Sequence, residues 1–128
     1  MNKKIISTGA LLGMIAIILG AFGAHALKKI LSADHLITFE TGVRYQMYHS
    51  LFLILIGTIF ELTEKTKKII YYLVISGVVL FSGSIYLLAT NELTPFDFKS
   101  IGFITPIGGL LLILGWGVLL VNIINKKS

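Results

Sequence analysis

Four apolar blocks follow one another along the chain, separated by short polar segments that hold most of the charged residues. Three blocks, 5–26, 69–89 and 101–124, are each long enough to form a helix of about 30 Å or more, the thickness of the hydrocarbon core of a bilayer. The second apolar run covers only 51–60, so a helix that crosses there must begin in the polar stretch before it. The pattern predicts an all-α integral membrane protein, a single membrane domain with four transmembrane helices at about 5–26, 45–62, 69–89 and 101–124.

The polar stretch before the second span has its own helical pattern. Ser32 is a good N-cap, and Asp34 would lie in the first turn, where a carboxylate suits the helix dipole. Apolar side chains recur at three- and four-residue spacings on one face, opposite a face of polar and charged side chains. We therefore predict an amphipathic helix over about 32–45, in the connection between the first two spans. It either lies on the membrane surface or runs directly into the second span.

Composition and charge agree with a membrane protein and set its orientation. Hydrophobic residues make up 55% of the chain and charged residues 13%, about half the usual share of charge in soluble domains. This composition argues against a soluble enzyme, a disordered chain and a nucleic-acid-binding module. Of the 11 Lys and Arg residues, the larger share flanks the two termini and the connection between the second and third spans. The positive-inside rule then predicts that both termini are cytoplasmic and that the first and third connections face outward.

One polar cluster is expected to enter the membrane from the outer side. With Glu61 at the inner boundary, His49 lies about 18 Å and Arg44 about 26 Å along the second span. Polar groups at that depth are costly and normally face other helices or a wet cavity. His25, at the outer end of the first span, is within reach of the cluster. The candidate ligand-binding residues are His25, Arg44, Tyr45, Gln46, Tyr48 and His49.

Three interpretations of this cluster remain open from the sequence. The polar groups can satisfy one another, with Arg44 paired to Glu40 and the tyrosines at the interface. They can instead line a small outward-facing pocket for a lipid headgroup, a quinone-like head or an anion. Haem held by His25 and His49 has the least support, because two isolated histidines at different depths are weak evidence for axial ligands. We therefore predict no cofactor, no metal site and no catalytic residue.

Small residues mark the faces along which the helices are expected to pack. In lipid, close backbone approach and dispersion contacts replace the hydrophobic drive for helix association. This packing serves either the interfaces within the chain or an interface between copies. Trp116 lies in the middle of the fourth span, so its indole N–H is expected to need a partner inside the protein. The expected packing glycines are Gly9, Gly13, Gly20, Gly23, Gly83, Gly108 and Gly109.

Four segments together resemble a known family. The segments 20–27 (GAFGAHAL), 39–49 (FETGVRYQMYH), 80–86 (LFSGSIY) and 104–109 (ITPIGG) are similar to those of the YwdK-like and YgdD-like small membrane proteins, which have mitochondrial relatives. The resemblance implies a four-span protein of the bacterial plasma membrane. It transfers no catalytic residue, because the family has no assigned activity.

The expected function is therefore that of a non-enzymatic structural or accessory membrane protein. Its partners would be membrane lipids and a second copy or another membrane protein, and not nucleic acid. One alternative is a small-solute transporter or channel, although no chain of acidic residues crosses the membrane to carry protons. Another is a membrane enzyme that acts on a lipid or a quinone. Ser82 and Ser84 are interpreted as small polar residues of a packed helix rather than as nucleophiles.

Overall fold

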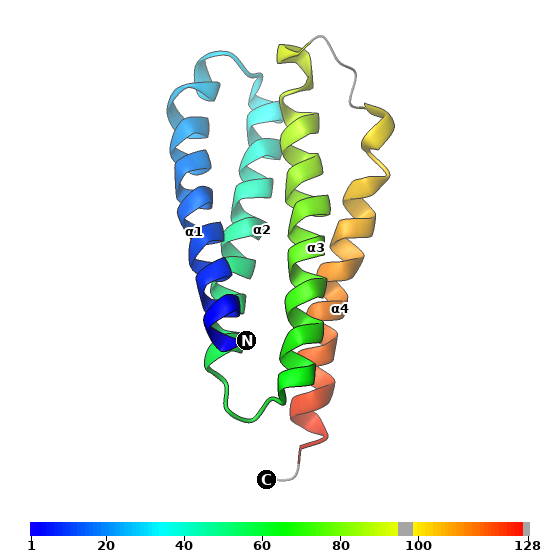
Figure 1. Ribbon diagram of the computed structural model, residues 1–128. Coiled ribbons are helices and arrows are strands. Elements are labelled where there is room, and N and C mark those ends of the chain that lie inside the picture. The colour runs from blue at the N-terminus through cyan, green and yellow to red at the C-terminus, as the bar shows by residue number, and fades with distance from the viewer. Residues whose placement is uncertain (95–98, 127–128) are drawn as a thin grey trace.

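The computed structural model describes residues 1–94 and 99–126, and within these ranges the chain is all helical, with no strand. Four long helices run alternately up and down (Figure 1). They are α1 (Asn2–His25), α2 (Ala33–Thr58), α3 (Glu64–Ala89) and α4 (Ile104–Ile124). Short 3₁₀ turns at Leu27–Lys29, Asn91–Leu93 and Lys99–Ile101 follow α1, follow α3 and precede α4.

Three of the long helices, α2, α3 and α4, begin at residues that suit the first turn of a helix. The Ser32 hydroxyl accepts a hydrogen bond from the His35 backbone N–H at 3.3 Å, and Thr63 caps α3 in the same way through Thr66 at 3.2 Å. Such caps satisfy backbone donors that have no partner within the helix. α4 begins at Ile104, so Pro106 lies in its first turn, where the missing N–H costs no helical hydrogen bond.

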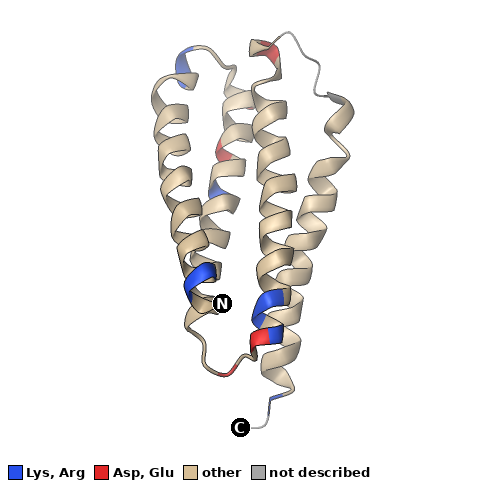
Figure 2. Cartoon of the chain, in the orientation of Figure 1, with Lys and Arg blue, Asp and Glu red and all other residues tan. Residues whose placement is uncertain are grey.

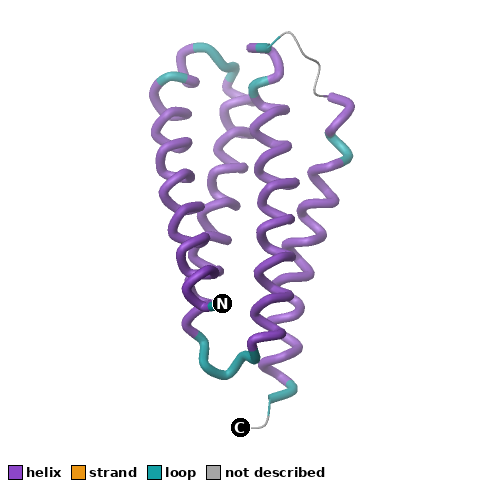
Figure 3. The backbone as a smooth tube through the Cα atoms, viewed as in Figure 1, coloured by secondary structure: helices purple, strands orange, loops and turns teal. Residues whose placement is uncertain are grey.

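Neighbouring helices in the sequence are also neighbours in space: α1 packs on α2, α2 on α3, and α3 on α4. The connections are confined to the two ends of the helices (Figure 3). We call the end that holds the N-terminus and the α2–α3 connection the terminal end, and the opposite one the loop end. The larger apolar core lies in the terminal half and the smaller one near the loop end. The fully buried members of the larger core are Ile5, Leu53, Ile56, Ile70 and Val74.

Three of the four helices are long and apolar enough to cross a membrane: α1 with the turn after it (Asn2–Lys29), α3 and α4. α2 is as long as α3, but its first half is too polar to qualify by composition. The expected amphipathic segment at 32–45 and the expected second span at 45–62 are parts of this one unbroken helix, which ends at Thr58. The structure therefore decides between the two possibilities left open above, because the segment continues directly into the apolar run.

Charged residues gather at the two ends of the helices (Figure 2). α1 and α3 carry Lys, Asp or Glu only within their first five residues, and α4 carries none within Ile104–Ile124. α2 is the exception, because Glu40 and Arg44 lie well inside its length. Any site that uses charge within the body of the protein must therefore involve α2.

Candidate functional site

The six candidate residues on α1 and α2 do not converge on one pocket. His25 lies exposed at the loop end of α1, whereas His49 is 4% exposed near the middle of α2. Arg44 is exposed, and Tyr48 is 50% exposed. Successive residues of a helix point about 100° apart, so the polar segment of α2 distributes its side chains over several faces.

Gln46 ties three helices together. Its Nε2 donates to the Leu12 carbonyl of α1 at 2.9 Å, and its Oε1 accepts from the Tyr86 hydroxyl of α3 at 2.6 Å. The residue is 4% exposed, so both bonds are shielded from solvent. Its amide is therefore engaged in packing and is not available to a ligand.

Both ring nitrogens of His49 are also occupied. Nδ1 lies 2.7 Å from the Tyr45 carbonyl, and Nε2 lies 3.0 Å from Trp116 Nε1 of α4. A carbonyl can only accept and an indole N–H can only donate, so the network assigns the proton to Nδ1 and makes the ring neutral. This contact confirms that Trp116 finds an internal partner. An axial bond from Nε2 to haem iron would require breaking the bond to Trp116.

Next to this pair lies a groove of about 430 Å³ between α2, α3 and α4. It is open to the side, because Tyr45, Ile113 and Trp116 are each 40% or more exposed. Its lining is largely apolar, and two of the six candidate residues, Tyr45 and His49, contribute to it. The full lining is Thr41, Tyr45, His49, Phe81, Gly109, Leu112, Ile113 and Trp116.

Glycines allow the close approach of α1 to α2 and of α4 to α3. A Cβ on Gly9 would lie 2.8 Å from the Ser50 carbonyl oxygen, and one on Gly13 would lie 2.6 Å from the Ser50 hydroxyl. Gly20 and Gly23 continue this stripe toward the loop end, with a Cβ at 3.5 Å from Val43 and at 3.1 Å from Phe39. The α1–α2 interface is therefore built on small residues of α1.

On the other side of the molecule, a Cβ on Gly108 would lie 2.3 Å from the Phe81 backbone nitrogen. Gly109 is less restricted, since a Cβ there would lie 3.5 Å from the Phe81 ring. Gly83 is also among the expected packing glycines, but a Cβ there would meet no atom within 4 Å. It faces open space on α3 and does not mark a contact between helices.

The serines of α3 serve as links between helices. Ser82 Oγ donates to the Gly42 carbonyl of α2 at 2.8 Å, and Ser84 Oγ lies 2.5 Å from Thr105 Oγ1 of α4. Both side chains are buried. Their hydroxyls are thus engaged in helix packing, and within residues 1–94 and 99–126 their hydrogen-bond partners are carbonyls and the Thr105 hydroxyl, not a base.

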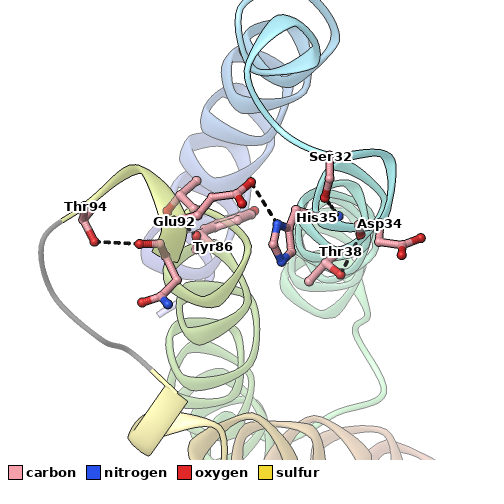
Figure 4. A network of polar contacts seen from close by, with 9 residues as sticks. Ser32, Asp34, His35, Thr38, Tyr86, Glu92 and Thr94 are labelled. Atoms are coloured by element: carbon pink, nitrogen blue, oxygen red, sulfur yellow. Dashed lines mark hydrogen bonds and ion pairs between the residues drawn. The ribbon is translucent and has the colours of Figure 1, made fainter.

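A polar network at the loop end has no counterpart in the sequence analysis (Figure 4). His35 Nδ1 of α2 lies 3.0 Å from Glu92 Oε1 in the turn after α3. Both side chains are more than 40% exposed, so water screens this contact. The two residues lie 57 positions apart, and no local pattern connects them. The contact joins the start of α2 to the end of α3 at the loop end.

Comparison with known proteins shows which family contains this chain. A family model described as "Protein of unknown function (DUF423)" matches residues 19–109. A UPF0382 membrane protein of Staphylococcus saprophyticus is 44% identical over 120 residues, covering 94% of this chain and 96% of that protein. The UPF0382 membrane protein YwdK of Bacillus subtilis is 35% identical over 121 residues, covering 93% and 94%. No solved structure matches the chain significantly.

The resemblance to YwdK-like proteins is thereby confirmed, and it covers the polar segment of α2 and the start of α4. The chain is a membrane protein of the UPF0382 (DUF423) family.

Proposed function

We propose that all four helices cross the bacterial plasma membrane and that both termini lie in the cytoplasm. α2 is about 39 Å long, enough to cross the hydrocarbon core, and it packs between α1 and α3. Its polar side chains Gln46, Ser50 and His49 are buried against neighbouring helices, which reduces the cost of placing them in the membrane. The excess of Lys at the terminal end supports the cytoplasmic orientation of that end.

Within this arrangement, we propose a non-enzymatic accessory protein that binds a membrane lipid in the groove between α2, α3 and α4. The observation that carries the proposal is the sideways opening of an apolar groove of about 430 Å³ on helices that face hydrocarbon. Such a groove suits an acyl or prenyl chain that enters from the bilayer. The hydroxyls of Thr41 and Tyr45, at the loop-end side of His49, would meet the polar head of the lipid.

The same geometry favours binding over chemistry or transport. A catalytic base or a proton carrier needs a lone pair or a proton that it can exchange with the substrate. His49 already donates to Tyr45 and accepts from Trp116, so it offers the groove neither group. No observation favours the transporter or the enzyme alternative in a comparable way.

Filling the groove provides the test, and two glycines of α4 form a matched pair for it. Gly109 lines the groove with room for a Cβ, whereas a Cβ on Gly117 would meet no atom within 4 Å. We expect Gly109→Leu to lower the amount of co-purifying lipid severalfold, as measured by mass spectrometry of extracts from protein purified in mild detergent. Gly117→Leu should retain the lipid of the unmodified chain. Equal lipid in the two variants, or no lipid in the unmodified chain, would contradict the proposal.

A further inference from the structure

A second pocket, at the terminal end, gathers positive charge from two helices. It is open to the surface, has a volume of about 490 Å³ and lies between the start of α1 and the first turns of α3. Figure 2 shows Lys in both helices at this end. The lining residues of α3 recur at spacings of three and four, so they share one face of that helix. We call it the lysine pocket, and its lining is Met1, Lys4, Glu64, Lys65, Lys68 and Tyr72.

Two tyrosines of α3 position the side chain of Lys4. Its Nζ lies 3.5 Å from the Tyr72 hydroxyl, and 5.4 Å and 5.6 Å from the centres of the Tyr71 and Tyr72 rings. The face of an aromatic ring attracts a cation but carries no net charge that would neutralise it. The Thr8 hydroxyl lies 2.9 Å from the Tyr71 hydroxyl, which joins the same two helices one turn further along α1. The ammonium group is therefore held between α1 and α3.

The lysine pocket carries more positive than negative charge. Three of its lining residues are lysines, and Glu64 is the single carboxylate among them. In the described part of the chain, the ion pair found is that between His35 and Glu92 at the loop end, so none of the three lysines is paired. All three are exposed. The side chains of the pocket thus offer a net charge of +2 to an anion from outside the chain.

The lysine pocket lies at the depth of lipid headgroups when α1 and α3 cross the membrane, as their length and composition allow. α3 is about 39 Å long, and Lys65 and Lys68 lie within about 6 Å of its start. A hydrocarbon core of about 30 Å leaves both lysines at its boundary. Tyr72 lies one helical turn deeper, near the interface where tyrosine is enriched.

We propose that the lysine pocket binds the phosphate of an anionic phospholipid. The phosphate oxygens accept charge-assisted hydrogen bonds from the ammonium groups of Lys4 and Lys68. The Tyr72 hydroxyl accepts from Lys4 and keeps its own proton to donate to the phosphate. Basic pockets between transmembrane helices bind anionic headgroups in this way.

The faces of α1 and α3 that carry the lysine pocket continue into the membrane as apolar surface. Leu11 and Ile15 lie on the face of Lys4, and Val79 lies on the face of Tyr72. These three side chains are exposed and would contact the acyl chains of the lipid. The site is separate from the groove between α2, α3 and α4, and it requires only that α1 and α3 cross the membrane.

Competition between two lipids of different charge tests the site. Purified protein in mild detergent is incubated with equal amounts of acyl-deuterated phosphatidylglycerol and phosphatidylcholine, and the bound labelled lipid is counted by native mass spectrometry. The deuterium separates added lipid from lipid that co-purifies. We expect severalfold more bound phosphatidylglycerol, because it alone of the two carries a net negative charge. Equal binding of the two lipids would overturn the proposal.

Adjacent lysines of α1 form a matched pair. Lys3 and Lys4 are both exposed, but Lys4 lines the pocket and Lys3 does not. Lys4→Gln should lower the ratio of bound phosphatidylglycerol to phosphatidylcholine by about fivefold, and Lys4→Arg should retain it by keeping the charge. Lys3→Gln should leave the ratio unchanged. Equal losses in Lys3→Gln and Lys4→Gln would assign the preference to the overall charge of this end and overturn the proposal.

The α3 side of the pocket gives a second variant. Lys68→Gln should lower the ratio as Lys4→Gln does, and an unchanged ratio would show that the pocket is not the site. Gly109→Leu should retain the ratio, because Gly109 lines the other groove. Loss of the ratio in Gly109→Leu would place the labelled lipid in that groove and overturn the present proposal alone.

A free anion is distinguished from a lipid by changing the buffer. Replacing chloride with inorganic phosphate at constant ionic strength should leave the preference for phosphatidylglycerol in place, because the acyl chains also hold the lipid. Loss of the preference in phosphate buffer would assign the pocket to a free anion and overturn the proposal.

Discussion

At the scale of single residues, the polar side chains inside the protein are matched to partners. Gln46, His49 and Ser82 each bond to a neighbouring helix, and in the described part of the chain no buried side-chain nitrogen or oxygen lacks a partner. An unmatched group in this setting would lose its water bonds without replacement. The buried polar residues of α2 therefore help to specify which helices it contacts.

The Gln46–Tyr86 bond gives a measurable consequence. We expect Tyr86→Phe to lower the free energy of unfolding by about 1 kcal/mol in detergent. Gln46→Leu should lower it further, because this change also removes the bond to the Leu12 carbonyl. Because both changes remove the bond between Gln46 and Tyr86, the double variant should lose less than the sum, with a coupling energy of about 0.6 kcal/mol. Tyr72→Phe, at an exposed hydroxyl 3.5 Å from Lys4 Nζ, is the control and should change stability little. Additive losses for the pair would show that the bond carries no energy of its own.

At the scale of elements, close backbone contacts at glycines position the helices in pairs. α1 lies against α2 through Gly9 and Gly13, and α4 lies against α3 through Gly108. Where a Cβ would meet backbone atoms, neither helix can adjust by rotating a side chain. The approach of the helices then depends on the absence of that one carbon atom.

Substitutions at Gly108 and Gly83 distinguish the effect of close backbone contact between helices from the effect of helix propensity. Gly108→Val should push α4 away from Phe81 and lower the unfolding free energy by about 2 kcal/mol or more. Gly83→Val introduces the same side chain into open space on α3 and should leave stability within about 0.5 kcal/mol. Unfolding of both variants in a graded detergent series measures the difference. Similar losses at the two sites would mean that backbone contact at Gly108 is not the cause.

At the scale of the whole molecule, the two ends of the protein differ in their number of positive charges, and the terminal end carries more Lys residues than the loop end. Lys65, Lys67 and Lys68 lie together at the terminal end, and Lys67 is buried with its Nζ at 3.1 Å from Asn2 Oδ1. The loop end carries Lys28 and Lys29 in the turn after α1. If the positive-inside rule decides the orientation, the terminal end faces the cytoplasm.

Thiol accessibility checks this orientation in intact cells. Lys28→Cys at the loop end should react with an impermeant maleimide, and Lys65→Cys at the terminal end should react only after the membrane is permeabilised. Both positions are exposed, so the difference reports the side of the membrane and not local burial. Labelling of Lys65→Cys before permeabilisation would reverse the orientation.

Much of the architecture could be predicted from the apolar pattern. Long apolar runs have one stable arrangement in a bilayer, a helix that satisfies its own backbone, so α1, α3 and α4 follow from run length. α2 has a short apolar run, and its prediction also needed the helical pattern of the polar stretch before that run. The family could likewise be recognised from short segments such as 20–27. The need of Trp116 for an internal partner followed from its position in the middle of a span, and the structure supplies His49.

The amino-acid sequence by itself thus determined the helices, the membrane environment and the polar residues that require an explanation. Only the tertiary structure decided which of those polar residues contact another helix and which lie on the surface. The helical period assigns each residue to a face of α2, but the packing order of the four helices determines what that face meets. Gln46 turns to α1 and α3, His49 turns to α4, and Arg44 points outward. That division follows from contacts between segments far apart in the chain, which no local pattern encodes.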